Sequence, residues 1–429
     1  MDGFLRPVFA LPLTLIERIR RRYSIGFPLT SAFPGATIYP GSVAATDPVV
    51  NVRLNAVQPG PSNGPRIALV HDWLVDVRGG ERVFQRICEA FPEGDIFTLI
   101  YDRDRMPEIF RQRGVRSSFI QLLPYAAHYR RVCLPLYPFA ARRLDLTKYD
   151  LVIASSSAWA SGVKVSPHAR LICYCHTPFR YAWSHYESLV LGRLPAFGRL
   201  TDALRSWVQK WDLESAGRVD LYIANSRVVQ QRIAAYYGRE SAIVPPPIDL
   251  RLFTPTGAPT ADYFLIVSAL MRYKRVDIAV DAFSQMGLQL KVVGDGEEAG
   301  LLRRMAGPSV QFLGRLPDAK IADLYANCRA FVFTADEDFG ITPLEAMASG
   351  RPVIAYRAGG ALETVVGGRT GVFFDCQSPE SLAEVIRATD FSAFNPVEIR
   401  NHAEQFGVPA FTENLHREVD RCMRGTCLA

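Results

Sequence analysis

Lysine is scarce in this sequence, so the basic charge is carried almost wholly by arginine. We count six lysines among the 49 lysine and arginine residues, which stand against 43 aspartate and glutamate residues and give a formal net charge of +6. The planar guanidinium group of arginine binds phosphate and carboxylate groups in a bidentate way, so the bias favours anionic partners. A codon bias would produce the same skew, and both explanations stay open.

The sequence also lacks the cysteine spacing of a disulfide framework or a zinc site. Its eight cysteines include no C-x-x-C pair, and some lie in apolar runs such as LICYC at 171–175. They are typical of small buried side chains in a reducing cytoplasm. No apolar run reaches the roughly 18 residues of a membrane span. With 48% hydrophobic and 21% charged residues, the composition is that of a globular protein.

The first 65 residues differ in composition from the rest. From Gly26 to Gly64 the chain is rich in Pro, Gly, Ser, Ala and Asn without a helical period, which indicates an extension or linker. The preceding segment 4–23 is apolar and then basic (IERIRRRY), and would either lie on an anionic membrane surface or form a poorly ordered tail. It has no small-residue cleavage site after a proper apolar region, so we expect no signal peptide.

From Arg66 onward, short apolar strands alternate with helical segments in two runs. In the first run we expect strands at 66–74, 95–101, 149–155, 170–176, 219–225 and 241–245. After Pro245-Pro246-Pro247 the pattern restarts, with strands expected at 263–270, 288–296, 310–314, 330–335, 352–357 and 370–374. Near-continuous apolar strands between helices indicate parallel sheets that are covered on both faces. We therefore predict an α/β fold of two doubly wound Rossmann-like domains that face each other across a cleft.

The domain boundaries follow from the same pattern. We expect an N-terminal extension over 1–65, a first domain over 66–247 and a second domain over 248–407. Residues 408–429 are expected to form a helix that packs back towards the first domain, with Phe411, Leu415 and Val419 on one stripe.

The densest chemical signal is ADEDFGITPLEAMASG at 335–350. Glu337 lies in the expected strand-to-helix loop, and Glu345 follows eight positions later. Gly340 allows the backbone to approach a ligand closely, and the amides after it lie at a helix N-terminus. Glu345 also completes a capping box that begins at Thr342, with Pro343 at the first helical position, and the spacing favours this structural role equally. Glu337 has no such structural role.

This stretch resembles the E-x7-E signature of retaining glycosyltransferases of family four, which have the GT-B fold. The resemblance extends along most of the chain from Arg66, and its combination of motifs is more specific than any one of them. The matching motifs are VHDWL with Gly79-Gly80-Glu81, CHTPFRY (175–181), ANSR (224–227), SALMRYKRVD (268–277), VGDG (293–296), FLGRLPD (312–318) and AGGALETV (358–365). Within the family, the sequence is most similar to bacterial O-antigen and exopolysaccharide mannosyltransferases.

The resemblance implies roles for the residues of the E-x7-E stretch. Glu337 would contact the donor sugar and Glu345 the ribose. The backbone amides of Phe339, Gly340 and Ile341 would bind sugar and phosphate oxygens. The resemblance also makes the first domain the acceptor side and the second domain the nucleotide-sugar side.

Lys274 follows the first strand of the second domain, where the leaving diphosphate would lie. A fixed cation there would stabilise the charge that develops as the glycosidic bond breaks, although a lone lysine is by default a solvated surface residue. The family has an arginine five positions earlier, where this sequence has Ala269. Arg272 or Arg275 would replace it, and we expect Arg272 among the donor-binding residues.

Two further candidates come from the first domain. Gly80, in the Gly79-Gly80 pair between a strand and a helix, would contact phosphate or sugar, although any tight turn of this kind favours glycine. His176 ends the strand LICYC; a histidine there is more often structural, but in the family it positions the donor sugar. Arg180 and Tyr181 would lie nearby on the acceptor side.

Metal binding is not expected. Two D-x-D triplets occur, at 102–104 and 336–338, and in single-domain glycosyltransferases such triplets hold a divalent cation. The second triplet lies inside the E-x7-E stretch, and no other histidine, cysteine or aspartate spacing suits a metal. We therefore expect no cofactor other than the nucleotide sugar, which is a substrate.

Together these features predict a retaining hexosyltransferase that moves mannose from GDP-mannose to a lipid-linked or saccharide acceptor in polysaccharide biosynthesis. No enzymic nucleophile is apparent, so we expect front-face displacement, with catalysis by positioning and charge stabilisation. The expected partners are the nucleotide-diphosphate sugar and the acceptor, without nucleic acid. We expect a cytoplasmic enzyme, and its basic, aromatic region 111–143 would either meet anionic lipid at the inner membrane face or form a solvated surface.

Two other functions fit parts of the sequence. A nucleotide-sugar epimerase of similar two-domain shape would share the donor site, and incubation with donor alone would reveal an isomerised sugar. The arginine excess would suit a nucleic-acid-binding protein, but the basic residues are scattered and the glycines stand where sugar nucleotides bind.

Overall fold

The computed structural model describes residues 64–123, 126, 133, 136–183, 198–257 and 260–425. The chain separates into two units, Met1–Pro61 and Ser62–Ala429, and everything below concerns the second. The expectations for the N-terminal extension lie outside the described residues, as do those for part of the region 111–143.

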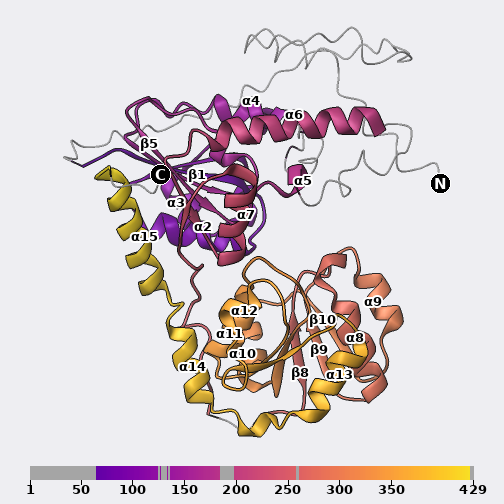
Figure 1. Ribbon diagram of the computed structural model, residues 1–429. Coiled ribbons are helices and arrows are strands. Elements are labelled where there is room, and N and C mark those ends of the chain that lie inside the picture. Colours follow the sequence, from indigo (N-terminus) through magenta and orange to yellow (C-terminus); the bar gives the residue numbers. More distant parts are fainter. Residues whose placement is uncertain are drawn as a thin grey trace, which may run out of the picture. The chain divides into compact units, whose positions relative to one another are not determined.

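Two parallel sheets form the framework of this unit (Figure 1). The first sheet has the strand order β3-β2-β1-β4-β5-β6-β7 and the second has the order β10-β9-β8-β11-β12-β13. We call the parts built on them the first and the second domain. The strands are β1 (Ile67–Leu74), β2 (Asp95–Tyr101), β3 (Val115–Ser117), β4 (Leu151–Ser156), β5 (Arg170–Cys175), β6 (Leu221–Ala224), β7 (Ser241–Ile243), β8 (Phe264–Val267), β9 (Leu290–Val293), β10 (Val310–Gly314), β11 (Ala330–Phe333), β12 (Val353–Tyr356) and β13 (Gly371–Phe374).

The predicted doubly wound α/β fold is confirmed, and twelve of these strands overlap the apolar runs that predicted them. Every residue of β4 is buried, as expected of a strand in the middle of a covered parallel sheet. The strand β3 was not predicted. It has three residues and pairs with β2 alone, so it carries too short a pattern to be read from the sequence.

Helices cover both sheets. In the first domain they are α2 (Gly79–Ala90), α3 (Glu108–Arg113), α4 (Tyr137–Arg142), α5 (Arg180–Trp183), α6 (Gly198–Ala216) and α7 (Arg227–Tyr237). The following helices are α8 (Val276–Met286), α9 (Ala299–Met305), α10 (Asp318–Asn327), α11 (Ile341–Ala348), α12 (Ala361–Thr364), α13 (Pro379–Ala388), α14 (Pro396–Glu404) and α15 (Val408–Met423). Figure 1 shows α6 across the first sheet from α2. Within the described residues, no helix combines the length and apolar character that a bilayer crossing requires.

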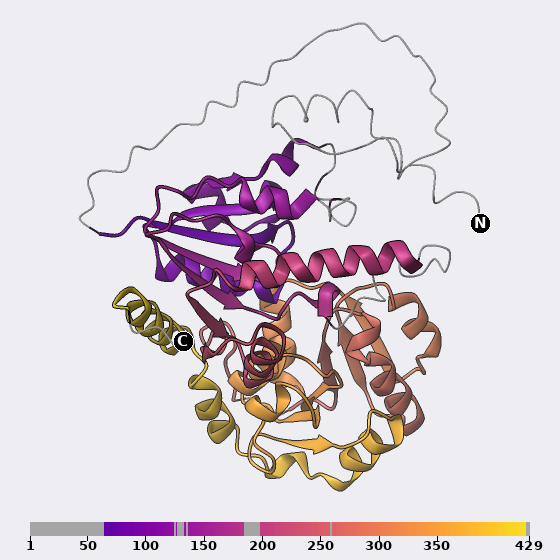
Figure 2. The same ribbon diagram turned by 45° about the horizontal axis from the view of Figure 1, so that its top comes forward.

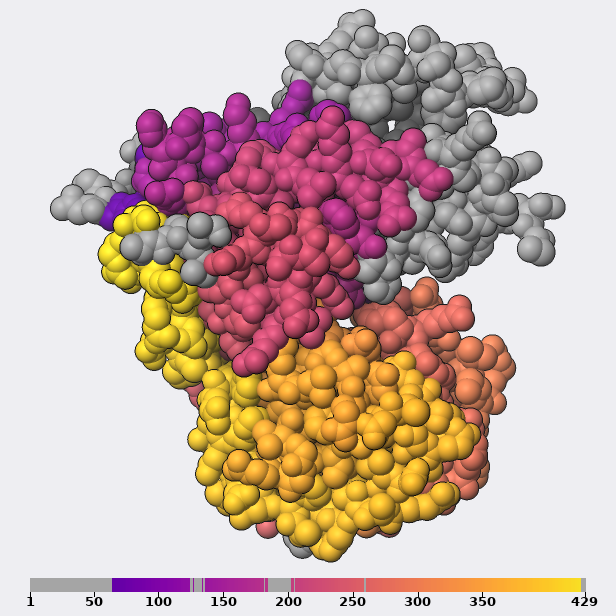
Figure 3. All heavy atoms as spheres, viewed as in Figure 1, coloured from indigo at the N-terminus to yellow at the C-terminus, as the bar shows by residue number. Residues whose placement is uncertain are grey.

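The last two helices join different cores. Ile399 and Ala403 of α14 belong to the core of the second domain. Phe411, Leu415 and Val419 of α15 are buried in the core of the first domain, where α15 packs beside α2. The segment of α14 and α15, yellow in Figures 1, 2 and 3, thus runs from one domain to the other.

The start of α11 differs from the prediction. The N-cap is Gly340, at φ 84°, and the helix begins at Ile341 without a side-chain cap. Thr342 is therefore a helical residue, and the predicted capping box from Thr342 to Glu345 is wrong. The reason is that Gly340 adopts a left-handed conformation that is unfavourable for other residues, and this allows the helix to begin at Ile341 and not after Thr342. Glu345 is released from a capping role.

In both sheets the strand order reverses between two central strands, β1 and β4 in the first and β8 and β11 in the second. Ligands of doubly wound sheets bind beyond the carboxyl ends of the strands at such a reversal. The loops after these four strands carry most of the predicted site residues.

Candidate active site

Lys274 and Glu337 form an ion pair at the carboxyl ends of two neighbouring strands of the second sheet. Lys274 ends a 3-10 turn, η8 (Arg272–Lys274), after β8, and Glu337 lies between β11 and α11. Thr334 Oγ1 donates to the Lys274 carbonyl (2.9 Å), which ties the two loops together. The paired side chains are only 14% and 22% exposed. The structure thus brings together a carboxylate and an ammonium group that the sequence placed as separate candidates.

The loop from Glu337 to Phe339 is supported by two glycines of the loop before α12. Gly360 N–H donates to the Glu337 carbonyl (2.8 Å), and a Cβ at Gly360 would lie 2.2 Å from Phe339 Cα. At Gly359, with φ 58°, a Cβ would lie 2.3 Å from the Glu337 carbonyl oxygen. Side chains at either position would displace the loop, so the glycines hold Glu337 and Phe339 in place.

The N-terminus of α11 offers backbone amides beside this loop. A Cβ at Gly340 would lie 2.9 Å from the ring of Phe333, so only glycine fits here without a shift. Ile341 is the first helical residue, and its Cδ1 lies 3.5 Å from the position that a Cβ of Gly79 would occupy. Uncapped amides at a helix N-terminus suit phosphate and sugar oxygens.

Glu345 is buried and hydrogen-bonded. Tyr325 Oη donates to its Oε2 (3.0 Å). Burial raises the pKa of Glu345 to about 7, although Arg82 of α2 and the tyrosine act in the opposite direction. Arg82 itself forms an ion pair with Asp318 of the second domain (2.7 Å). The carboxyl group therefore lies close to a cation of the first domain.

Arg272 and Arg275 are the two candidates for the role of the family arginine that Ala269 replaces, and their surroundings differ. Arg275 forms an ion pair with Asp277 (3.1 Å) and has φ 51°, a left-handed conformation. The side chain of Arg272 is exposed and makes no ion pair or hydrogen bond among the described residues. Arg272 is thus the arginine that remains available to a diphosphate.

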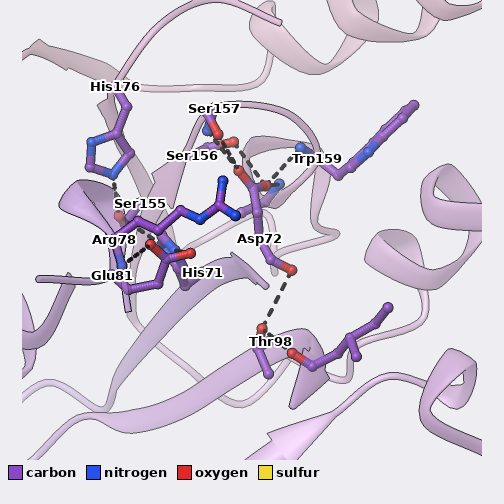
Figure 4. Close-up of polar contacts among 12 residues, drawn as sticks. His71, Asp72, Arg78, Glu81, Thr98, Ser155, Ser156, Ser157, Trp159 and His176 are labelled. Carbon is purple, nitrogen blue, oxygen red and sulfur yellow. Dashed lines mark hydrogen bonds and ion pairs between the residues drawn. The ribbon is translucent and has the colours of Figure 1, made fainter. Parts of the chain in front are cut away.

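His176 lies at the end of β5 and belongs to a chain of polar side chains (Figure 4). Its Nε2 lies 2.8 Å from Ser155 Oγ, and the same hydroxyl lies 3.1 Å from His71 Nδ1. On the far side of His71, the Nε2 atom is 4.0 Å from Glu81 Oε1. Asn225 Nδ2 donates to the His176 carbonyl (3.0 Å). Burial, and secondly His71, lower the pKa of His176 to about 3, so the ring is neutral.

Gly80 lies beside this chain. A Cβ there would lie 3.7 Å from both His176 Nε2 and His71 Cε1, which are ordinary contact distances. The Gly79-Gly80 turn therefore lies between the histidine rings and Ile341.

Asp72, next to His71 in β1, has a structural role (Figure 4). Its buried carboxylate accepts hydrogen bonds from the amides of Ser157 (2.7 Å), Trp159 (2.8 Å) and Ala160 (2.7 Å). Ser156 Oγ donates to the same carboxylate (3.3 Å). This set of donors holds the loop after β4 and leaves Asp72 without a role in the donor site.

Ion pairs join the two domains beside the Glu337 loop. Asp338 pairs with both Arg180 of α5 and Arg232 of α7. Burial alone would raise the pKa of Asp338, but the two guanidinium groups outweigh it and lower the pKa. Nearby, the Glu363 carboxylate accepts from the Arg227 amide at the start of α7 (2.9 Å). Figure 3 shows the surfaces of the α7 region and the second domain in contact.

The predicted absence of a metal remains a prediction. Among the described residues, no cluster of three or more histidine, cysteine, aspartate or glutamate side chains could hold an ion. Within the second D-x-D triplet, Glu337 faces Lys274 and Asp338 faces two arginines. The side chain of Tyr181 lies outside the described residues.

Known proteins are similar to this chain in sequence and in fold. The family model described as Glycosyltransferase Family 4 matches residues 77–252, and that described as Glycosyl transferases group 1 matches residues 253–389. The D-inositol 3-phosphate glycosyltransferase of Geodermatophilus obscurus is 31% identical over 350 residues, which cover 71% of this chain and 75% of that protein. The chain belongs to glycosyltransferase family four.

This glycosyltransferase is also similar to a GDP-mannose-dependent alpha-mannosyltransferase of Mycolicibacterium smegmatis. The two are 30% identical over 220 residues, 47% of this chain and 57% of the relative, so the enzyme spans less than two thirds of that protein. The fold of this chain matches that of Anabaena Alr3699/HepE, solved in complex with UDP, with a TM-score of 0.61 and 19% sequence identity. The match covers 83% of this chain and 99% of the other. The predicted GT-B fold is confirmed.

Some residues of the glycosyltransferase site were not singled out from the sequence. His71 and Ser155, which are linked to His176 by hydrogen bonds, lie in the second half of the central strands β1 and β4, and this position was the available signal. Arg232, on α7, could not be predicted as a site residue, because its ion pair with Asp338 depends on the contact between the two domains.

Proposed function

We propose that the enzyme transfers mannose from GDP-mannose, with retention of configuration, to a lipid-linked or saccharide acceptor in polysaccharide biosynthesis. The observation that carries this proposal is the Lys274–Glu337 pair beside the uncapped N-terminus of α11. It supplies a cation for a leaving diphosphate and a carboxylate for sugar hydroxyls at one place. The similarity to a GDP-mannose-dependent mannosyltransferase supports the choice of donor.

The reaction would proceed by displacement on one face of the sugar. The bond from the anomeric carbon to the phosphate oxygen breaks, and its electron pair leaves with the diphosphate. The acceptor hydroxyl forms the new bond on the same face and gives its proton to the leaving phosphate. Lys274 and the amides that follow Gly340 stabilise the growing negative charge.

The other residues would hold the substrates. Glu337 would accept hydrogen bonds from hydroxyls of the donor sugar, and Glu345 from the ribose. Arg272 would supply the second cation for the diphosphate. His176, which stays neutral, would contact the sugar from the first domain.

A donor screen tests the proposal. The enzyme is incubated with GDP-mannose, GDP-fucose, UDP-glucose and UDP-galactose, with and without saccharide acceptors, and nucleotide release is measured. We expect the highest kcat/KM for GDP-mannose and a product with the anomeric configuration of the donor by NMR. A preference for a UDP-sugar would overturn the donor assignment, and an isomerised sugar without acceptor would indicate an epimerase instead.

We also propose that the enzyme works at the cytoplasmic face of the membrane as a peripheral protein. The basic segment IERIRRRY at 16–23 supports this location, because basic side chains attract anionic lipid headgroups. Removing residues 1–60 should leave an active enzyme on soluble acceptor with weaker binding to vesicles that contain phosphatidylglycerol. Unchanged vesicle binding would argue against the segment as an anchor.

A further inference from the structure

The Ser155 hydroxyl lies between two histidine rings, and this restricts where their protons lie. A hydroxyl has one proton to donate, so it can donate to one ring nitrogen only and must accept from the other. Its neighbours are His176 Nε2 at 2.8 Å and His71 Nδ1 at 3.1 Å. When both rings are neutral, their tautomers are therefore coupled through Ser155.

With both rings neutral, two arrangements satisfy both hydrogen bonds. In the first, His71 Nδ1–H donates to Ser155, which donates to a bare His176 Nε2. In the second, His176 Nε2–H donates to Ser155, which donates to a bare His71 Nδ1. The two arrangements place opposite groups on His176 Nδ1: a donor in the first and an acceptor in the second.

Glu81 selects between them. Its Oε1 lies 4.0 Å from His71 Nε2, and its other oxygen accepts from the Arg78 amide (3.1 Å), which holds the carboxylate in place. The first arrangement turns a bare lone pair of His71 towards this carboxylate, whereas the second presents an N–H. Because the rings are buried in a region of low dielectric, the second arrangement is favoured.

We propose that Glu81, His71 and Ser155 are positioning residues that hold the proton of His176 on Nε2 and leave Nδ1 as a hydrogen-bond acceptor for a hydroxyl of the donor sugar. His176 Nδ1 makes no hydrogen bond within the part of the chain that the structure describes. An acceptor at a sugar hydroxyl raises the electron density of the ring, which stabilises the positive charge that develops on the sugar. The role in sugar binding rests on the proposed function, whereas the tautomer does not.

Histidine NMR on the full-length enzyme tests the tautomer. The chain has seven histidines, so selective ¹⁵N labelling gives few signals, and His176→Asn and His71→Asn variants assign two of them. In the free enzyme near neutral pH, we expect long-range ¹H–¹⁵N correlations of the Nε2–H form for both rings. In Ser155→Ala and in Glu81→Gln, His176 should shift towards a mixture of the two forms. A His176 ring in the Nδ1–H form, or one that is unchanged in both variants, would overturn the proposal.

Kinetics with a matched control complete the test. Ser155→Ala should lower kcat by about tenfold, the lower end of the range for partners that orient metal-bound histidines, with a smaller change in the KM for donor. Ser156→Ala is the control, since it makes the same change at the next residue of β4, where the hydroxyl donates to Asp72 instead. It should leave the histidine spectrum unchanged. Equal kinetic losses in both variants would indicate a purely structural role. If the donor screen instead finds another sugar, the NMR result still stands.

Discussion

The guanidinium group of Arg180 forms an ion pair with the carboxylate of Asp338, and these residues belong to different domains. Arg232 forms a second pair with the same carboxylate. Asp338 is the neighbour of Glu337, so the loop that carries a predicted donor ligand is held by two cations of the first domain. The relative position of the domains and the geometry of this loop are therefore linked.

Asp338→Asn should weaken this link. The change leaves two partly buried guanidinium groups without their charge partner, so the free energy of unfolding should fall by about 1–2 kcal/mol. Activity should fall by about tenfold, because Glu337 is less well positioned. Urea unfolding and steady-state kinetics provide the measurements. Arg315→Ala removes the long ion pairs of an exposed arginine with Asp76 (3.9 Å) and Asp295 (4.0 Å) and should change stability by less than about 0.5 kcal/mol. Equal losses in both variants would contradict the prediction.

Lys274→Ala should lower kcat by about two to three orders of magnitude, as for the loss of one preorganised donor to a developing charge. The KM for donor should change less, because the proposed contacts of Glu337 and Glu345 with the ground-state donor would remain. Lys320→Ala, which removes an exposed lysine of α10, is the control. Near-normal turnover in Lys274→Ala would remove this loop from the diphosphate site.

The two neighbouring arginines should behave differently. The Arg272 side chain has no partner among the described residues, whereas that of Arg275 is paired with Asp277. We therefore expect Arg272→Ala to lower kcat/KM for the donor by about tenfold or more, in keeping with the loss of a hydrogen bond to a charged group. Arg275→Ala should keep wild-type kinetics. A reversed pattern would assign the role lost at Ala269 to Arg275.

Glu345 should make stability depend on pH. Its pKa is raised from 4.5 to about 7 by burial, so between these values the folded protein keeps a proton that the unfolded chain releases. The contribution of Glu345 to stability is therefore fully present below pH 4.5 and is lost as the pH rises through 7. Urea midpoints at about pH 5 and about pH 8 should show a decline in the wild type that is smaller in Glu345→Gln. Equal declines would place the proton elsewhere.

Activity should survive treatment with EDTA. Two carboxylates of the triplet 336–338 are paired with cations: Glu337 with Lys274, and Asp338 with Arg180 and Arg232. We therefore expect charge stabilisation to come from side chains and helix amides. Initial rates before and after EDTA, and after added manganese, provide the measurement. Complete loss that manganese restores would show that the triplet binds a metal.

Local features of this enzyme could be predicted from its sequence. Buried parallel strands leave continuous apolar runs, so both sheets were predicted, apart from the three-residue edge strand β3. The spacing of Glu337 and Glu345 and the glycines around them located the E-x7-E stretch, because a strand, a tight turn and a helix follow one another in the chain. The capping pattern indicated an N-cap at Thr342, two residues too late, because Gly340 permits the helix to begin at Ile341.

Only the tertiary structure decided which side chains meet. Asp338 lies 158 positions from Arg180 and 106 from Arg232, and Ser155 lies 84 positions from His71. Contacts across such separations depend on the order of strands in a sheet and on the packing of one domain against the other. They leave no period in the sequence, because each partner is set by the path of the whole chain and not by its neighbours. The sequence by itself thus determined the two sheets and the loop that carries Glu337. Only the fold decided how this loop is paired with the first domain and which hydroxyl links the two histidines.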